Sequence, residues 1–178
     1  ALPRAVHDVA AEEVGWPSHV APPPERLAGE FRATIARDGA AAASLEAAYA
    51  GLTHVGGSGT RSNQRNQDAC FSSECGGRAL ILGVLDGHGP DNGRLAAAAG
   101  AAALCAHLEE NVARLEVDPQ GAMHAAFGSA HAAIRSALFE KATALHGSPP
   151  VEVSPGGYLL GTDAQPLDGG ATASVVAV

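Results

Sequence analysis

The sequence has 178 residues and a formal net charge of −8 at neutral pH, and its 11 Lys and Arg residues are scattered singly. This distribution argues against a nucleic-acid partner, because neutralising a phosphate backbone needs a clustered basic face. The chain has 39 Ala, whereas Leu, Ile, Val and Phe together make up only about 20% of it, so we expect one modest domain and some loosely held chain.

No membrane segment is predicted. The longest apolar run, 95–106, is mostly alanine and is shorter than the roughly 18 to 20 residues that a spanning helix needs. Charged residues interrupt the first positions, so no signal peptide is predicted either. The three cysteines, Cys70, Cys75 and Cys105, form no CxxC pair and suit a reducing compartment. We therefore expect an intracellular protein, in the cytoplasm or the nucleus.

The first 52 residues are predicted to be an N-terminal extension that is flexible and then helical. Residues 1–24 carry five prolines and little hydrophobic periodicity, which is typical of extended chain. After them, Leu27, Phe31 and Ile35 recur every four positions, and a second group of apolar residues follows. This spacing predicts helix over 25–52, broken near the central glycine.

Two short apolar segments are predicted to be neighbouring strands. The first covers 69–71, and the second, 79–85, follows a turn at two glycines. The second segment is apolar on both faces, so we expect a strand buried inside the fold. It ends in the polar turn 86–89, Asp-Gly-His-Gly.

Two helices follow this turn. Apolar residues from Leu104 to Leu115, spaced by four, four and three, predict the first. The second has clear end signals, with Asp118 as the N-cap, Pro119 at the first helical position and Gly147 at the C-terminus. Within this helix, four larger apolar residues are expected to pack in the core: Met123, Phe127, Ile134 and Leu138.

The last segment, 170–178, is predicted to be a strand, and the chain stops within it. A sequence that ends inside a core element, with no turn or polar cap after it, leads us to expect a missing C-terminal half of the domain.

The most informative feature is a pair of acidic residues at the ends of the two predicted strands. Asp68 precedes the first strand and Asp86 ends the second. In an antiparallel hairpin the start of one strand lies beside the end of its partner, so the two carboxylates can converge at the rim of the sheet. Carboxylate and carbonyl oxygens suit Mg²⁺ or Mn²⁺. Gly87 would let its carbonyl approach the ion, and His88 is placed to exchange a proton.

Three motifs resemble the PPM family, the type 2C metal-dependent protein serine/threonine phosphatases. They are 66–69 (Asn-Gln-Asp-Ala), 83–90 (Gly-Val-Leu-Asp-Gly-His-Gly-Pro) and, after the two helices, 169–173 (Gly-Gly-Ala-Thr-Ala). They occur in the family's order, and the second is the specific one. The resemblance covers about 53–178, which we predict to be the N-terminal portion of a phosphatase domain.

The resemblance implies a fold, a cofactor and an activity. The fold would be α+β, a partial four-layer α-β-β-α sandwich of mainly antiparallel sheets, with a binuclear Mg²⁺ or Mn²⁺ centre at one end. Asp86 would bridge the two ions, Gly87 would lend its carbonyl and Asp68 would hold metal-bound water. This water would attack the phosphorus of a phosphorylated protein substrate, and His88 would protonate the departing serine or threonine oxygen.

Three features depart from the family pattern. Gln67 stands where many members have Glu, and an uncharged amide would hold the second metal less tightly. The family's phosphate-gripping arginine falls at Asn63, so its neighbours Arg61 and Arg65 are the candidates for phosphate binding. The remaining metal-binding aspartates would lie beyond the end of this sequence, so the chain alone is predicted to be inactive.

Two function classes stay open. The first is an enzyme that hydrolyses phosphoserine or phosphothreonine. The second is an inactive pseudophosphatase that keeps the fold and acts as a binding or regulatory module. Residues 86–89 could also be an ordinary tight turn with no function. The accompanying motifs favour the metal-binding interpretation over this one.

Overall fold

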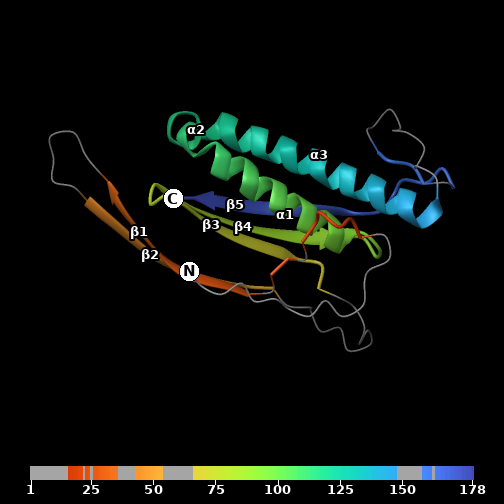
Figure 1. Cartoon of the computed structure of the whole chain (residues 1–178), viewed down its shortest axis with the longest axis horizontal. Helices are drawn as coiled ribbons and strands as arrows, with labels where there is room; N and C mark the ends of the chain where they lie inside the picture. The colour runs from red at the N-terminus through yellow and green to blue at the C-terminus, as the bar shows by residue number, and fades with distance from the viewer. Residues whose placement is uncertain are drawn as a thin grey trace.

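The computed structural model describes residues 16–21, 23–24, 26–35, 43–53, 66–147, 158–161 and 163–178. The elements in chain order are β1 (Arg26–Ile35), β2 (Ala43–Leu52), β3 (Ala69–Cys75), β4 (Ala79–His88), α1 (Gly93–Glu110), α2 (Val112–Val117), α3 (Pro119–His146) and β5 (Gly170–Ala177). Two antiparallel sheets form, β1-β2 and β3-β4-β5. Helix α1 lies between the larger sheet and α3 (Figure 1). The predicted α+β class is therefore confirmed. No helix in the described part of the chain is long and apolar enough to cross a membrane.

The helix predicted over 25–52 is wrong, because β1 and β2 form an antiparallel hairpin there. Residues four apart lie on the same face of a helix, after about one turn, and also on the same face of a strand, after two repeats. This spacing therefore does not distinguish a helix from a strand. Along β1 the exposure alternates residue by residue: Leu27 and Phe31 point inward and their neighbours are exposed. Gly29 lies beneath the ring of Tyr49 across the hairpin, a position with no room for a side chain. The boundary drawn at residue 53 stays a prediction.

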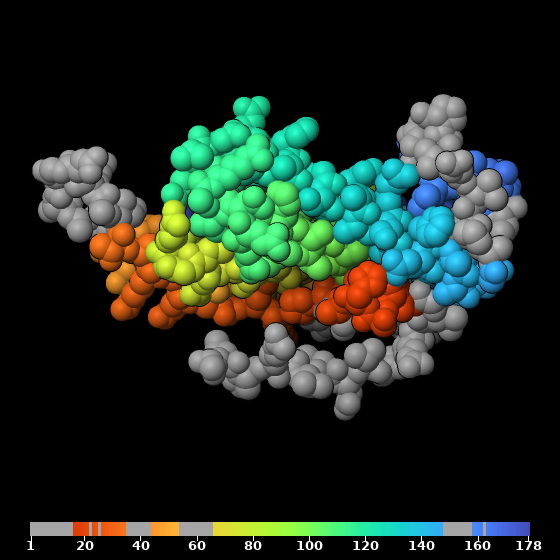
Figure 2. All heavy atoms as spheres, turned by 45° about the horizontal axis from the view of Figure 1, so that its top comes forward, coloured from red at the N-terminus to blue at the C-terminus, as the bar shows by residue number. Residues whose placement is uncertain are grey.

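Part of the segment predicted to be flexible is packed. Residues 16–20 form a turn in which the Trp16 indole N–H donates to the Val20 carbonyl over 2.6 Å. Val20 is buried against α1 and α3, and the guanidinium of Arg94 lies 5.4 Å from the centroid of the Trp16 ring. Figure 2 shows the red spheres of this segment against the cyan spheres of α3. Residues 1–15 lie outside the described residues.

The strands predicted at 69–71 and 79–85 are present as β3 and β4, and β4 runs on to His88. Strand β4 is the central strand of its sheet. On the face toward the helices Ile81 and Leu85 are fully buried. On the other face Leu80 is also buried, with 1% of its surface exposed, whereas Val84 is 53% exposed. The predicted burial on both faces is therefore correct for the face that α1 covers and for Leu80 on the other face, and it is wrong for Val84. The predicted last strand is β5.

The end signals of the long helix are confirmed. The Asp118 side chain accepts a hydrogen bond from the Gly121 N–H over 2.9 Å, and Gly147 ends α3 in the left-handed conformation with φ 67°. The helix that precedes α3 was predicted to have one continuous apolar face. This face is instead divided between α1 and α2, because the helix is interrupted at Asn111.

Alanines, rather than the larger apolar residues, form the buried face of α3. Leu138 is buried as predicted, and Met123 and Ile134 pack against the core while staying partly exposed, but Phe127 is 42% exposed, so its predicted place in the core is wrong. The residues that α3 buries are mostly small: Ala122, Ala126, Ala130, Ala137, Leu138 and Ala142. Small side chains let α1 and α3 approach closely, which leaves Phe127 at the edge of the contact.

This core predicts a large difference between two leucine substitutions. Leu104→Ala removes a fully buried side chain of α1, and we expect it to lower the free energy of unfolding by about 2–5 kcal/mol. Leu145→Ala, the matched control in α3, alters a side chain that is 45% exposed and should change this free energy much less. Urea unfolding followed by circular dichroism measures both. Equal losses in the two variants would contradict the core described here.

Candidate metal centre

The strand pairing brings Asp68 and Asp86 together. Ala69 of β3 lies opposite Leu85 of β4, and both face the helices. Because side chains alternate along a strand, the adjoining Asp68 and Asp86 project from the opposite face of the sheet. The pKa of Asp68 is raised, first by burial and then by the negative charge of Asp86 and a hydrogen bond between the two carboxyl groups. The predicted convergence of the two carboxyls is therefore present.

The turn before β3 is held by Asn66. Its side-chain oxygen accepts from the Asp68 N–H over 3.2 Å, and its amide nitrogen donates to the hydroxyl of the buried Thr53 over 2.7 Å. These two bonds fix the backbone from which the Asp68 carboxyl projects.

Gly87 permits the closest backbone contacts near the two carboxyls. A Cβ at this position would collide with the carbonyl oxygens of both Gln67 and Gly93. The Gln67 side chain donates from Nε2 to the Gly89 carbonyl over 2.9 Å, so its amide holds the turn that follows β4. A glycine is thus needed at position 87 because three segments pack closely there: the turn before β3, the end of β4 and the start of α1. The motif alone did not reveal this reason for the glycine.

His88 lies at the exposed end of β4, on the same face of the sheet as Asp86. It pairs with Gly170 of β5, and a Cβ on Gly170 would lie 2.5 Å from the Nε2 of His88. The glycine before the Ala-Thr-Ala sequence therefore makes room for the imidazole. The second and third motifs, which lie far apart in the sequence, are therefore in direct contact at this point of the sheet.

Sequence reasoning missed Asp168, which lies beside this group. Its pKa is raised, first by burial and then by Asp91, while a hydrogen bond from the Asp91 backbone, Lys141 and His88 act in the opposite direction. Its Oδ1 is buried and has no hydrogen-bond partner within the described ranges. Asn92 donates to its backbone carbonyl over 2.6 Å. The one signal in the sequence was its position directly before the Gly-Gly-Ala-Thr-Ala motif.

Two carboxylates that repel one another suit a hard divalent cation, which would neutralise them. Such an ion takes about six oxygen ligands, and among the residues that the structure describes no group of three or more His, Cys, Asp or Glu side chains is arranged to hold a metal. Within the described ranges, Asp68 and Asp86 thus come together as a pair of carboxyl groups without a third acidic, histidine or cysteine side chain arranged with them for a metal. Arg61 and Arg65, predicted to bind phosphate, lie outside the described residues.

The three cysteines are free thiols, as expected. Cys70 is buried, and burial raises its pKa. Burial, followed by the nearby Glu109, raises the pKa of Cys105 to about 12. A protonated, half-buried thiol is a poor nucleophile, which disfavours Cys70 and Cys105 as nucleophiles.

Comparison with known proteins gives one match. A family model described as protein phosphatase 2C matches residues 55–176, which is more than half of the chain and includes the carboxylate pair, His88 and all of β5 except its last residue. Searches of curated proteins and of solved structures returned no significant match. The family match agrees with the resemblance carried by the three motifs. The chain therefore belongs to the protein phosphatase 2C family.

Proposed function

We propose that this chain is the N-terminal part of a metal-dependent protein serine/threonine phosphatase, which hydrolyses phosphoserine and phosphothreonine in proteins. The observation that carries the proposal is the convergence of Asp68 and Asp86 beside His88, inside the segment that matches the family. Family membership supports the proposal that the protein hydrolyses phosphoric monoesters. The pair of carboxyl groups supports the proposal that this reaction needs a bound cation.

In this proposal Asp68, Asp86 and the Gly87 carbonyl hold Mg²⁺ or Mn²⁺. When bound, the two ions would supply Lewis-acid activation of the phosphate ester and of the attacking water. The residues of this chain bind and orient the ions, and Arg61 and Arg65 hold the phosphate oxygens. His88 delivers a proton to the serine or threonine oxygen as it leaves. The carboxylates act from strand ends, so the substrate meets a preorganised site.

The alternative is a pseudophosphatase that binds partners without turnover. Two observations favour it: the family's common Glu is Gln67, whose amide is engaged by the Gly89 carbonyl, and the described residues hold no group of three or more metal-ligating side chains arranged around an ion. We propose that further ligands come from chain beyond residue 178 and that residues 1–178 alone do not turn over substrate.

The finer fold prediction is also a proposal. Val84 and Val176 are each more than half exposed on the face of the larger sheet opposite α1. Exposed apolar residues on a sheet face favour a further packed layer. We infer that a second sheet and helix layer complete a four-layer sandwich here.

Phosphate release from a phosphoserine peptide tests the enzymatic proposal. The full-length protein, loaded with Mn²⁺, is expected to release phosphate, and a chelator is expected to stop the reaction because the proposed mechanism needs the bound ions. Re-adding Mn²⁺ should restore it. A folded full-length protein that binds Mn²⁺ but never releases phosphate would instead favour the pseudophosphatase.

His88→Ala tests the proton donor. An alkoxide leaving group needs a proton, whereas an activated aryl phosphate does not, so the variant should lose more than about tenfold in kcat on phosphoserine peptide and much less on p-nitrophenyl phosphate. Steady-state kinetics on both substrates provide the comparison. Equal losses on the two substrates would remove His88 from this role.

A further inference from the structure

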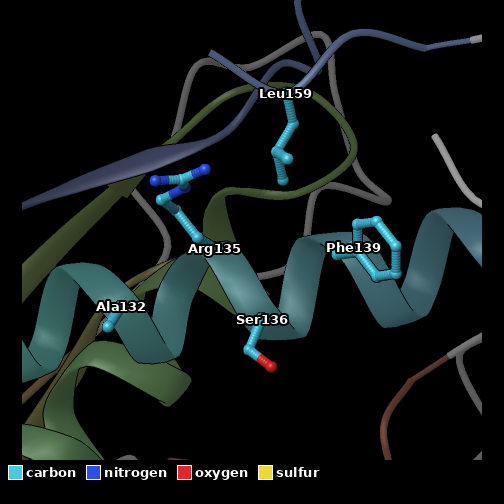
Figure 3. Close-up of a pocket in the computed structure, with 5 residues that line it drawn as sticks. All are labelled: Ala132, Arg135, Ser136, Phe139 and Leu159. Carbon is cyan, nitrogen blue, oxygen red and sulfur yellow. The ribbon is translucent and has the colours of Figure 1, made fainter. Parts of the chain in front are cut away.

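A cavity of about 290 Å³ lies between α3 and the segment 158–161, and neither Asp68 nor Asp86 lines it (Figure 3). Its lining residues come from one side of α3 and from the segment above it: Ala132, Arg135, Ser136, Phe139 and Leu159. The segment above α3 is held by its own backbone, because the Leu167 N–H donates to the Leu159 carbonyl over 2.7 Å. The cavity therefore has two walls, each built on ordered backbone.

Arg135 is the unusual residue of this cavity. Its Nε is buried and has no hydrogen-bond partner among the residues described by the structure. Other arginines are paired: Arg78 lies 2.7 Å from Glu116, and Arg114 lies 3.2 Å from Asp118. A buried donor of a charged group without an acceptor is unfavourable. Among the described residues, Arg135 thus lacks the carboxylate partner that Arg78 and Arg114 have.

The nearest acid on α3 is already engaged. Glu140 accepts from the Ser136 hydroxyl over 3.2 Å and lies 3.5 Å from His19. Figure 3 shows the Arg135 guanidinium on the same side of α3 as Leu159, while the Ser136 hydroxyl points the other way. Among the described lining residues, the cavity therefore offers the Arg135 cation without a carboxylate beside it.

We propose that this cavity binds an oxyanion, a carboxylate or a phosphate, carried next to an apolar group. A guanidinium presents parallel N–H donors that match both oxyanions. Phe139, which is 40% exposed, and Leu159 supply an apolar wall for the hydrocarbon part of the ligand. The net charge of −8 opposes general attraction of anions, so binding depends on Arg135. This site is independent of the proposed phosphatase activity.

Two stable probes test the site: benzoate for the carboxylate and phenylphosphonate for the phosphate. Each is titrated into the ¹⁵N-labelled chain in EDTA, and inorganic phosphate serves as the probe that lacks an apolar part. We expect saturable shifts of the amide resonances of 135–139 and Leu159, with inorganic phosphate binding more weakly. The oxyanion that binds tighter identifies the preferred ligand.

Substitutions then decide whether Arg135 is responsible. Arg135→Gln should weaken binding at least about tenfold, because a charge-assisted pair is lost, whereas Arg114→Gln, which alters a surface pair, should leave it unchanged. Unchanged affinity in Arg135→Gln, or shifts confined to residues around Asp68 and Asp86, would overturn the proposal.

Two further variants keep the test decisive if Arg135→Gln does not fold. Arg135→Lys retains the charge without the planar fork and should bind with intermediate affinity. Phe139→Ala should weaken benzoate more than inorganic phosphate. Wild-type affinity for both probes in these two variants would also overturn the site.

Discussion

Asp86→Asn in the full-length protein is expected to abolish Mn²⁺-dependent hydrolysis of a phosphoserine peptide, with a loss in kcat/KM of at least about 100-fold. The substitution keeps the size of the side chain but removes one of the two charges that converge at the rim of the sheet. Phosphate release at saturating Mn²⁺ is the measurement. Asp163→Asn, which alters an exposed carboxyl in the loop before β5, is the matched control and should keep normal turnover.

In the absence of metal, the same variant is expected to lose no thermal stability, although it loses activity. The negative charge of Asp86 helps to raise the pKa of Asp68, so the folded protein is destabilised when both carboxyls are ionised. Removing that charge should make metal-free Asp86→Asn melt at the same or a higher temperature than wild type. The gain applies above the raised pKa of Asp68, because well below pH 3.8 the carboxyl is protonated in both folded and unfolded chains. Normal turnover, or a lower melting temperature without metal, would contradict the assigned role.

Gly87→Ala is expected to be the most damaging of the single-methyl changes. The added carbon would collide with the backbone carbonyls of Gln67 and Gly93, neither of which can move without shifting the turn before β3 or the start of α1. We expect a loss of about 1–3 kcal/mol or more in the free energy of unfolding, together with weaker Mn²⁺ binding. Denaturant unfolding of the metal-free protein measures the first effect.

Gly128→Ala is the matched control for this change. Gly128 lies within α3, and a Cβ there meets nothing within 4 Å. The same substitution should therefore stabilise the protein by about 0.5–1 kcal/mol, since alanine favours helix over glycine. If Gly87→Ala unfolded at the same denaturant concentration as wild type, the close packing of the three segments would be disproved.

Signals from residues close together in the sequence predicted the helices and strands around the site. The features that they did not predict depend on pairing between strands far apart in the sequence. The caps at Asp118 and Gly147 depend on adjacent residues, so the limits of α3 could be predicted from the sequence. The approach of Asp68 to Asp86 could be predicted because one short turn joins their strands. Asp168 was missed because its position beside His88 depends on the pairing of β5 with β4, and three helices separate these two strands in the sequence.

The hairpin of β1 and β2 shows a different limit. Leu27 and Phe31 lie on one side of a helix and equally on one side of a strand, so their spacing alone favoured the wrong element. The glycines, Gly29 and Gly51, lie opposite large side chains of the partner strand. Their role depends on pairing, and spacing along one segment does not reveal it.

The central claim is that the carboxyls of Asp68 and Asp86 jointly hold a divalent cation. Titration of Mn²⁺ into the full-length protein, followed by the loss of the free-ion electron paramagnetic resonance signal, tests it most directly. The account predicts saturable binding in the wild-type protein and its loss in both Asp68→Asn and Asp86→Asn, with Asp163→Asn unchanged. Undiminished Mn²⁺ affinity in the two site variants would contradict it.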